Sequence, residues 1–319
     1  MVLEIKNLVV SLDTFYKRIE ILKNLDFSIG KNEVVSLVGE SGCGKTFTAL
    51  SIMKLLPKNA KIEKGEIFIE GENITEKSEK DIAKIRGNKV SMIFQEPSSY
   101  LNPVFTIGNQ MTECIKEKIS KKEKEEKIFK VLKEVNLSED VFFQYPHQLS
   151  GGMQQRVMIG MAIINSPSLL IADEPTTALD VTTAFHIINL LKKLIKTHNI
   201  SVLFITHDIC LAINFSDKIY VMYAGKIVEK APSKKIISCP LHPYTEKLIL
   251  CLPEKYKKGE RIKAIPGNVP DFSSLPSGCA FHPRCPYKKQ ICKNFSPAEV
   301  KIGENYVRCF KYGEIVENN

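Results

Sequence analysis

A glycine-rich turn near the start of the chain constrains the fold more than any other feature. Residues 39–46 read Gly-Glu-Ser-Gly-Cys-Gly-Lys-Thr and fit the pattern G-x-x-x-x-G-K-[ST]. The apolar run at residues 34–38 predicts a short buried strand before this turn, and residues 47–56 predict an apolar-faced helix after it. Backbone N–H groups in such a turn bind phosphate oxygens, and glycines keep side chains out of the way. We therefore expect a nucleoside triphosphate site, with Lys45 at the β- and γ-phosphates and the Thr46 hydroxyl on Mg²⁺.

Length and composition are those of an ordinary globular protein. The 319 residues are 44% hydrophobic and 25% charged, which suits one large domain with an appendage or two domains. No run of about 18 apolar residues occurs. The first residues alternate like a strand instead of forming the apolar region of a signal peptide. We therefore expect a cytosolic protein.

The formal net charge of +9 is unevenly placed, because most of the excess of lysine and arginine lies in residues 232–319. Such a basic segment indicates either a nucleic-acid or membrane-surface partner or a lysine-rich solvated surface. We favour the solvated surface, since the positive residues are scattered rather than gathered in one block.

Hydrophobic patterns over residues 1–231 alternate between strands and helices. Apolar or alternating runs predict strands at residues 3–10, 22–29, 64–71, 90–94, 169–173, 201–206, 218–223 and 226–229. Helical patterns cover residues 81–86, 107–136, 151–164 and 182–197. This order predicts an α/β fold with a mainly parallel sheet covered on both faces, to which a small antiparallel β subdomain is attached.

The pattern changes after residue 231, where prolines accumulate and the periodicity fades. We place a domain boundary there, between a nucleotide-binding domain at residues 1–231 and a small irregular, cysteine-rich extension at residues 232–319. The chain holds nine cysteines, and in a cytosolic protein we expect none of them in a structural disulfide.

An acidic pair follows a buried strand later in the chain. Residues 169–172 are apolar, Asp173 ends the run, and Glu174 comes directly after it. In a parallel sheet the carboxyl end of this strand lies beside the phosphate loop. Asp173 would then hold Mg²⁺, directly or through water, and Glu174 would polarise the attacking water as a general base.

A second anion-binding pattern begins a helix at residues 149–156, which read Leu-Ser-Gly-Gly-Met-Gln-Gln-Arg. Ser150 stands in a capping position, and Gly151 and Gly152 let a phosphate approach the start of the helix. One phosphate loop already surrounds the phosphates from one side. A second helix terminus could close the other side if a partner chain donated it.

Together these motifs resemble those of ATP-binding-cassette (ABC) ATPases, in the expected order over roughly residues 1–230. The matching segments are Walker A at residues 39–46, a Q-loop at Gln95, the signature at 149–156, Walker B ending at Asp173 and Glu174, a D-loop at 178–180 and a switch histidine at His207. The resemblance implies a P-loop ABC core with a mainly parallel sheet, an antiparallel β subdomain and a helical signature subdomain.

The resemblance also implies how the site is assembled. Two cassettes form a head-to-tail dimer, and each ATP lies between Walker A of one chain and the signature of the other. The signature residues that would act in trans are Ser150, Gly151 and Gly152. The residues implied to contact the nucleotide from Walker A and the helix after it are Ser41, Gly42, Cys43, Gly44, Lys45, Thr46 and Phe47.

Three catalytic residues are implied: Glu174, Gln95 and His207. Gln95 would touch Mg²⁺ and the attacking water, and His207 would contact the γ-phosphate. The implied Mg²⁺ ligands are Thr46, Gln95 and Asp173.

An aromatic residue before the phosphate loop resembles the one that stacks on adenine in this family. Tyr16 is the favoured candidate and Phe15 is its rival. Strand alternation points two neighbouring rings in opposite directions, so only one of them can stack. We therefore expect Tyr16 to contact the adenine.

Segments outside the ATPase motifs are similar to those of importers for oligopeptides, dipeptides and nickel. Residues 95–103 resemble the FQDPxxSLNP stretch of peptide-importer ATPases. Residues 239–245 contain the sequence HPYT, which begins a helix in that subfamily, and residues 265–270 and 278–286 continue the match. The resemblance thus covers nearly the whole chain.

The subfamily implies a set of partners. The chain would pair with a homologous second ATPase beneath two membrane permease subunits, and an extracytoplasmic solute-binding protein would supply the substrate. Its expected place is peripheral, on the cytoplasmic face of the cell membrane. We expect no nucleic-acid partner.

Four of the cysteines cluster late in the chain with the spacing C-x5-C-x6-C-x16-C: Cys279, Cys285, Cys292 and Cys309. Four thiolates in a segment with little core suggest a metal, because little else would fold it. Zinc usually shows tight C-x2-C pairs, whereas these gaps suit a bulkier cluster, though spacing alone does not decide. The resembled subfamily carries a [4Fe–4S] cluster on such cysteines, which implies one here. Free buried thiols are the alternative.

These features predict the ATP-binding and ATP-hydrolysing subunit of an ABC importer for dipeptides or oligopeptides. ATP binding closes the dimer and hydrolysis reopens it, which drives alternating access in the membrane subunits. An importer of nickel or another metal chelate shares the C-terminal signature and stays an alternative. A non-transport ABC ATPase acting on nucleic acid or ribosomes is a second alternative, against which the HPYT extension argues.

Overall fold

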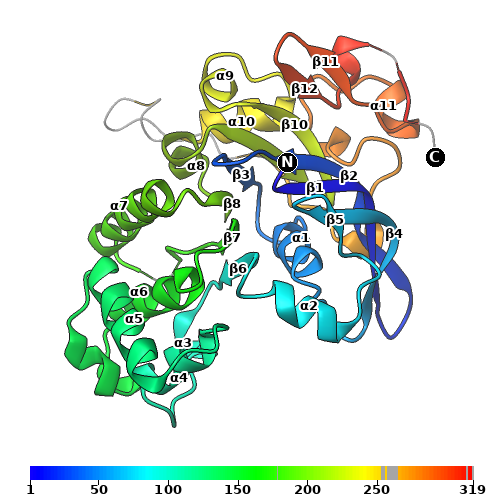
Figure 1. Cartoon of the computed structure of the whole chain (residues 1–319). Helices are drawn as coiled ribbons and strands as arrows, with labels where there is room; N and C mark the ends of the chain where they lie inside the picture. Colours follow the sequence, from blue (N-terminus) through cyan, green and yellow to red (C-terminus); the bar gives the residue numbers. More distant parts are fainter. Residues whose placement is uncertain (178, 253–255, 257–264, 314, 318–319) are drawn as a thin grey trace. The chain divides into compact units, whose positions relative to one another are not determined.

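The computed structural model of the chain describes residues 1–177, 179–252, 256, 265–313 and 315–317 (Figure 1). The chain divides into two compact units. The first comprises Met1–Glu4, Ser28–Glu33 and Phe68–Leu203, and the second comprises Ile5–Phe27, Val34–Ile67 and Phe204–Asn319. The phosphate loop (residues 39–46) therefore belongs to the second unit.

The first unit contains two neighbouring parallel strands, β6 (Val90–Ile93) and β7 (Leu169–Asp173). All residues of both strands are buried. A strand that is covered on both faces reads as a continuous apolar run, which is the pattern that predicted these two. A short antiparallel pairing joins the end of β4 (Ala60–Ile69) to β5 (Glu72–Asn73).

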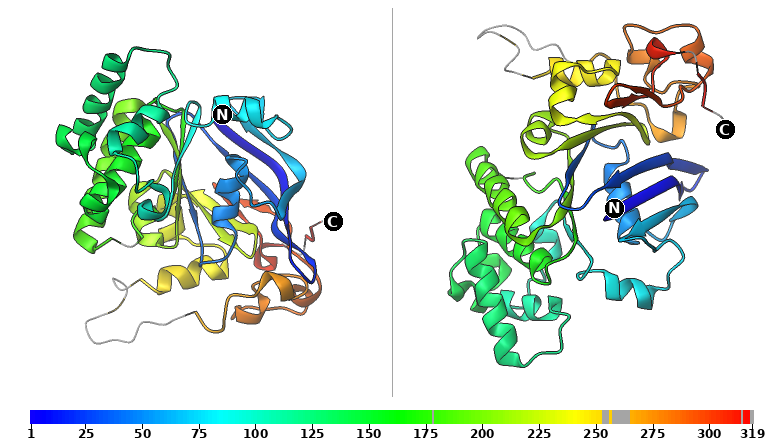
Figure 2. Two further views of the ribbon diagram at one scale, coloured as in Figure 1. Left: turned by 90° about the horizontal axis from the view of Figure 1, so that it is seen from below. Right: turned by 45° about the horizontal axis from the view of Figure 1, so that its top comes forward.

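Helices form the rest of the first unit, and α3 to α6 pack against one another (Figures 1 and 2). Their bounds are α2 (Glu79–Ile85), α3 (Pro97–Tyr100), α4 (Ile107–Cys114), α5 (Lys121–Glu134), the 3-10 turns η1 (Glu139–Phe143) and η2 (Pro146–Gln148), α6 (Gly151–Ile163) and α7 (Val181–His198).

The helical pattern predicted over residues 107–136 forms two helices, with a break between them. The helix α4 ends at Cys114, and the chain turns to extended backbone at Ile115. Ser120 then begins α5 with a capping box: its hydroxyl accepts from the N–H of Glu123, whose carboxylate accepts from the N–H of Ser120 at 2.7 Å. A serine followed three residues later by glutamate is the local signal of this second start.

The sheet of the second unit runs in the order β11-β12-β10-β9-β3. The strand β3 (Val34–Val38) pairs in parallel with β9 (Lys218–Tyr223), and β9 pairs antiparallel with β10 (Lys226–Pro232). The C-terminal extension adds β12 (Asn305–Val307) to β10 and β11 (Val300–Ile302) to β12. The extension is therefore less irregular than the sequence predicted, since part of it continues this sheet.

A second sheet holds β2 (Arg18–Ile29), β1 (Leu3–Asp13) and β4 as neighbours, which matches the predicted β subdomain. The strand β8 (Ser201–Thr206) is buried throughout, as its apolar sequence predicted. The remaining helices are α1 (Lys45–Ile52), α8 (Ile209–Phe215), α9 (Ser233–Ser238), α10 (Pro243–Leu250) and α11 (Ile291–Asn294), with 3-10 turns at Phe272–Ser274, His282–Arg284 and Phe310–Tyr312.

One apolar core joins the phosphate-loop strand to the extension within the second unit. Val38, the last residue of β3, belongs to the same cluster of buried residues as Tyr244 of α10 and Phe281. Tyr223 packs against both aromatic rings, with its own ring 4.7 Å from that of Tyr244 and 5.2 Å from that of Phe281. The extension is thus part of the core that supports the phosphate loop.

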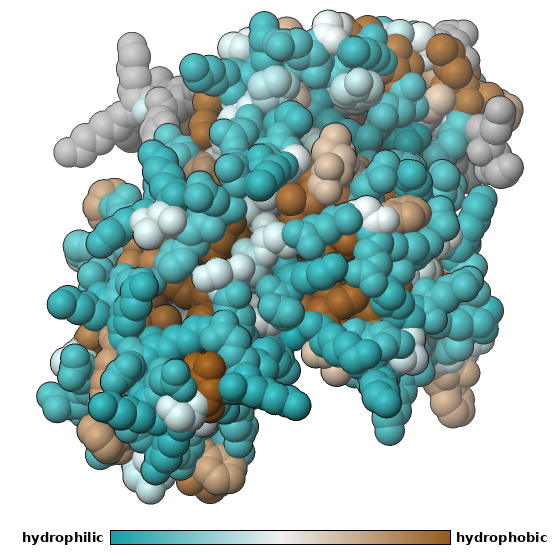
Figure 3. Space-filling view, in the orientation of Figure 1, coloured by the Kyte–Doolittle hydropathy of each residue, from teal (hydrophilic) through white to brown (hydrophobic). Residues whose placement is uncertain are grey.

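Hydrophilic residues cover most of the face drawn in Figure 3, and the apolar residues form scattered patches there. The charged stretch at the start of α5 is solvent-facing, with exposed pairs of Lys121 with Glu125 and of Lys122 with Glu126. Among the residues that the structure describes, no helix combines the length and the apolar character needed to cross a membrane.

Candidate nucleotide-binding site

Three glycines give the phosphate loop its shape. Gly42 and Gly44 have φ angles of 79° and 108°, in the left-handed region that other residues adopt only with strain. Gly39 is needed for space instead, because a Cβ there would lie 2.3 Å from the carbonyl oxygen of Met222. The loop therefore forms the turn that the glycine pattern predicted, between the end of β3 and the start of α1.

The side chain of Lys45 is folded back into the phosphate loop and is only 5% exposed. Its Nζ donates to the carbonyl oxygens of Gly39 at 2.8 Å and of Glu40 at 3.1 Å. These carbonyls hold the ammonium within the loop, where its three donors can turn to phosphate oxygens. Thr46 is exposed in the first turn of α1, as a hydroxyl that is to reach a metal ion must be.

Cys43 contributes its backbone to the loop rather than its thiol. Its carbonyl oxygen accepts from the N–H of Gly225, in the turn between β9 and β10, at 2.9 Å. Burial raises the pKa of the Cys43 thiol, so it stays protonated and packs as a small apolar group. Ser41 is exposed and Phe47 half-buried on either side of the loop.

The acidic pair lies at the carboxyl end of β7, in the first unit. Asp173 is 2% exposed as the last residue of the strand, and Glu174 follows with a left-handed φ of 46°. Glu174 Oε2 accepts from Thr177 Oγ1 at 2.9 Å and from Gln95 Nε2 at 3.4 Å. The structure therefore brings together two of the three residues predicted to be catalytic.

The structure forms the helix start that the sequence predicted at Ser150. Ser150 caps α6, and its hydroxyl accepts from the N–H of Met153 at 3.4 Å. Gly151 is exposed, and among the described residues a Cβ there would meet Leu179 Cδ2 at 3.9 Å, an ordinary contact distance. A Cβ at Gly152 would lie 2.7 Å from Thr183 Cγ2, so a side chain there would have to displace that residue of α7.

The switch histidine lies in the second unit. His207 is exposed and comes directly after β8. Asp208 caps α8 by accepting from the N–H of Leu211 at 3.1 Å. In the predicted D-loop, Asp180 caps α7 in the first unit, while residue 178 lies outside the described residues.

Comparisons with known proteins decide the family. The ABC transporter family matches residues 22–177, and the C-terminal region of oligopeptide/dipeptide transporters matches residues 228–292. The oligopeptide transport ATP-binding protein AppD of Bacillus subtilis is 45% identical over 98% of this chain and 97% of its own length. The chain belongs to the ABC transporter ATP-binding family.

Two further proteins are similar to most of the chain. The probable D,D-dipeptide transport ATP-binding protein DdpD of Escherichia coli is 42% identical over 97% of this chain and 95% of its own. The dimeric post-hydrolysis structure of the cassette MJ0796 bound to ADP and Pi is 31% identical, with a TM-score of 0.65, and covers 72% of this chain and 98% of that chain. The predicted ABC ATPase fold is confirmed, and the chain is an ATP-hydrolysing cassette.

The reasoning that separated Tyr16 from Phe15 in this ABC ATPase was wrong. The two residues lie in the turn between β1 and β2, not in a strand, so alternation does not apply to them. Both rings are nearly free of neighbours, with Phe15 95% and Tyr16 90% exposed, and they meet edge to face at 5.3 Å. Either ring is accessible to a nucleotide base.

The four clustered cysteines of the ABC ATPase line one cavity of about 150 Å³. Burial, with a smaller effect of the neighbouring thiols, raises the pKa of Cys279 to about 12. Burial also raises the pKa of Cys285 and Cys309. Yet no group of three or more His, Cys, Asp or Glu side chains within the described residues is arranged to hold a metal ion. The expectation of a [4Fe–4S] cluster is therefore not supported by the structure.

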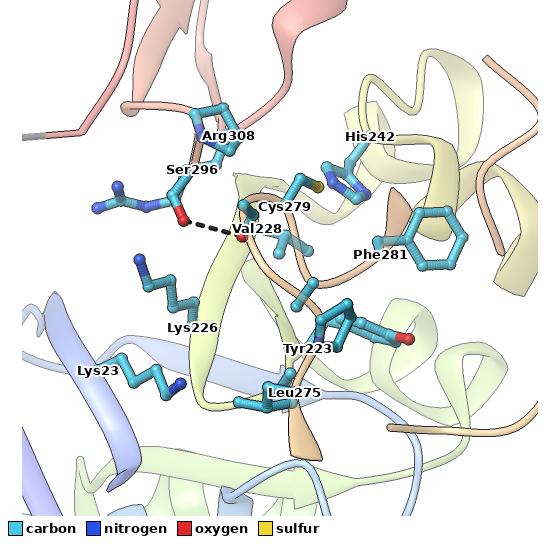
Figure 4. A pocket seen from close by; sticks show the side chains of 15 residues that line it. Lys23, Tyr223, Lys226, Val228, His242, Leu275, Cys279, Phe281, Ser296 and Arg308 are labelled. Carbon is cyan, nitrogen blue, oxygen red and sulfur yellow. Dashed lines mark hydrogen bonds between the residues drawn. The ribbon is translucent and has the colours of Figure 1, made fainter. Parts of the chain in front are cut away.

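A second cavity, of about 110 Å³, is lined by Lys23 and Lys226 and by Arg308 of the extension, beside apolar residues (Figure 4). Lys226 and Arg308 both pair with the carboxylate of Glu317. Burial lowers the pKa of Lys23, whose ammonium also faces the charge of Lys226. This cavity is separate from the phosphate loop, and no predicted site residue except Cys279 lines it.

Sequence reasoning missed two residues of the extension that touch the phosphate loop of the ABC ATPase. Arg284 pairs with Glu40, the second residue of the loop, and the hydroxyl of Tyr244 accepts from the N–H of Glu40 at 2.9 Å. The available signal was the HPYT sequence, which marked Tyr244 as a family feature without showing what it contacts.

Proposed function

We propose that this chain is the ATP-hydrolysing subunit of an ABC importer for dipeptides or oligopeptides. The observation that carries this is the pair of family matches on one chain, an ABC cassette at residues 22–177 followed by an oligopeptide/dipeptide C-terminal region at residues 228–292. Relatives that are named for oligopeptide and D,D-dipeptide transport match it over almost their full length. The domain boundary that we propose at residue 231 lies close to the start of the second match.

We propose the following roles around bound ATP. Lys45 holds the β- and γ-phosphates, and His207 contacts the γ-phosphate. Glu174 takes the proton of the attacking water as general base, and the Gln95 amide, which lies 3.4 Å from Glu174, orients that water. Tyr16 is the proposed adenine contact, together with the backbone of the phosphate loop.

Mg²⁺ suits the oxygen donors that this chain offers. Thr46, Gln95 and Asp173 supply a hydroxyl, an amide carbonyl and a carboxylate, which are the ligands that a hard cation prefers. When bound, Mg²⁺ neutralises charge that develops on the phosphate oxygens. Asp173 is buried at the end of β7, where its carboxylate stays oriented by the strand.

The site is completed in trans. We propose that Ser150, Gly151 and Gly152 cover the ATP of a homologous second ATPase in a head-to-tail dimer. The capped and exposed start of α6 supports this, because its backbone N–H groups are available to a phosphate from another chain. Two permease subunits and a solute-binding protein complete the importer, with this chain peripheral on the cytoplasmic face of the membrane and no nucleic-acid partner.

Uptake in cells tests the substrate class. We would delete the gene and complement it with the wild-type chain or with Glu174→Gln, and then measure uptake of a labelled dipeptide, a labelled pentapeptide and labelled nickel. We expect peptide uptake to be lost on deletion and restored only by the wild-type chain. Loss of nickel uptake alone would establish the metal-importer alternative, and unchanged uptake of all three would point to a non-transport ATPase.

The [4Fe–4S] cluster on Cys279, Cys285, Cys292 and Cys309 stays a proposal. Its support is that the four thiols share one cavity, and the absence of a metal-holding group in the described residues counts against it. Anaerobic purification of the full chain with iron, sulfide and zinc analysis tests it. Broad visible absorbance with iron and sulfide would support the cluster, and a colourless protein with reduced thiols would exclude it.

A further inference from the structure

The phosphate loop is fastened to the C-terminal extension through its second residue, Glu40. The guanidinium of Arg284 donates from Nη1 to Glu40 Oε2 at 2.7 Å and from Nη2 to Glu40 Oε1 at 2.9 Å. The Arg284 side chain is 5% exposed and that of Glu40 is 26% exposed. Two parallel charge-assisted hydrogen bonds between shielded groups make a strong pair with a fixed geometry.

Arg284 is itself held in place before it reaches Glu40. Its Nε donates to the carbonyl oxygen of Pro266 at 3.0 Å, and Nη1 also approaches the hydroxyl of Tyr223 at 3.4 Å. The guanidinium carbon lies 5.9 Å from the centre of the Tyr223 ring, which Figure 4 shows beside Phe281. The hydrogen bonds to Glu40 raise the pKa of Arg284, so it is charged at every physiological pH.

Tyr244 holds the backbone of the same residue. Its hydroxyl accepts from the N–H of Glu40 at 2.9 Å. The Tyr244 side chain is fully buried, and its ring packs at 4.7 Å from Tyr223 and 5.4 Å from Phe281. A ring fixed in this way keeps the Glu40 N–H directed at the extension.

We propose that Arg284 and Tyr244 are positioning residues for ATP binding, which set the charge and the geometry of the phosphate loop through Glu40. A carboxylate in a loop that binds a polyphosphate repels its own ligand. The bidentate pair with Arg284 cancels that charge and turns the carboxylate toward the extension, while Tyr244 holds the loop backbone at its start. The extension therefore contributes to the affinity of the ATP site, and this inference rests on the assignment of residues 39–46 as that site.

The competing explanation is that the pair only anchors the extension to the rest of the unit. The two explanations predict different ATP affinities for a chain that lacks both Arg284 and the Glu40 charge. If Arg284 acts by neutralising Glu40, removing the Glu40 charge restores ATP affinity in a chain that lacks Arg284. If the pair is only an anchor, removing Glu40 as well restores nothing.

The test measures binding of Mg²⁺ and a non-hydrolysable ATP analogue to the full chain by calorimetry, and thermal unfolding of each variant. The variants are Arg284→Ala, Arg284→Lys, Glu40→Gln, the double variant Arg284→Ala with Glu40→Gln, and Tyr244→Phe. Arg308→Ala is the matched control, because Arg308 makes an ion pair of similar exposure with Glu317 in the same extension without touching the phosphate loop.

We expect Arg284→Ala to raise the Kd of the analogue about tenfold, which is the size expected for one uncompensated charge near the protein surface. Arg284→Lys keeps the charge and loses the paired geometry, so its Kd should rise less. The double variant should bind within about threefold of wild type, and Arg308→Ala should bind like wild type. Tyr244→Phe should weaken binding about fivefold while the chain stays folded.

Three outcomes would overturn the inference. One is a double variant that binds as weakly as Arg284→Ala, and another is an equal loss of affinity in Arg308→Ala. The third is unchanged affinity in Arg284→Ala. If Arg284→Ala fails to fold, the Kd values of Arg284→Lys and Tyr244→Phe for the ATP analogue test the inference instead. Lys45→Ala tests the assignment of the ATP site independently of this inference. Unchanged binding of the analogue in that variant would show that residues 39–46 are not the ATP site.

Discussion

The side-chain amide of Gln95 lies 3.4 Å from the carboxylate of Glu174, although 79 residues of sequence separate them. Gln95 follows β6 and Glu174 follows β7, and these two strands pair in parallel. The carboxyl ends of neighbouring parallel strands meet at one edge of a sheet, which is where ligands bind in folds of this class. The contact therefore follows from strand pairing, and it joins the proposed general base to the residue that we propose to orient its water.

Truncation of Gln95 tests this relationship. Gln95→Ala removes the amide that contacts the Glu174 carboxylate, so we expect kcat to fall about tenfold with little change in the affinity for ATP. Steady-state ATP hydrolysis by the assembled importer measures both values. Gln290→Ala, at an exposed position, is the control and should leave kcat unchanged. A rise in KM with constant kcat would show that Gln95 serves binding and not the chemical step.

The close packing around Gly39 predicts that a side chain at this position lowers the stability of the fold. A Cβ in Gly39→Ala would meet the backbone carbonyl of Met222 at 2.3 Å, and backbone moves less readily than a side chain. We expect a loss of about 1–3 kcal/mol in the free energy of unfolding, measured by chemical denaturation. Gly151→Ala is the control, since Gly151 also lacks a left-handed φ and the neighbour described for a Cβ there, Leu179 Cδ2, lies at 3.9 Å. An unchanged free energy of unfolding in Gly39→Ala, or an equal loss in Gly151→Ala, would show that the contact with Met222 is not the cause.

The buried imidazole of His242 predicts a loss of stability in acid. Burial lowers the pKa of His242 to about 3, and its Nδ1 accepts from the N–H of Tyr244 at 3.0 Å, which requires the neutral ring. The unfolded chain binds this proton below its ordinary pKa of about 6.5, whereas the folded chain does not. The contribution of His242 is therefore complete above pH 6.5 or so and is lost by about 1.4 kcal/mol per pH unit as the pH falls toward 3.

Denaturant unfolding between pH 7 and 4 measures that slope. Burial raises the pKa of the neighbouring Glu229, which gives a slope of the opposite sign, so the comparison is between variants at each pH. His242→Gln should flatten the pH dependence, and the exposed His147→Gln should not. If wild type and His242→Gln lose stability in parallel over this range, the ring is not the group that titrates.

Features that depend on neighbouring residues were predictable from the sequence. Each of three features is encoded by a pattern of adjacent residues that has a direct physical cause. They are the phosphate loop, the capped start of α6 at Ser150 and the buried strand β7 that ends at Asp173. The break between α4 and α5 also had a local signal at Ser120. It was hidden because the flanking residues are good helix formers, which made the whole stretch read as a single helix.

Features that depend on distant residues were not predictable in the same way. Nothing in the composition around Arg284 indicates that its partner is Glu40, 244 positions earlier. The strands β11 and β12 are three residues each, too short to show an alternation. The spacing of the four cysteines suggested a metal site. Within the described residues, however, their folded arrangement does not provide a group that could hold a metal ion.

We propose that ATP hydrolysis at Glu174 drives peptide import. ATP-dependent uptake of a labelled dipeptide into vesicles that contain the reconstituted importer tests it most directly. We predict rapid uptake with the wild-type chain, and uptake reduced about 100-fold or more with Glu174→Gln, which still binds ATP. The exposed Glu126→Gln should transport like wild type. Uptake by Glu174→Gln at the wild-type rate would show that hydrolysis at Glu174 does not drive import.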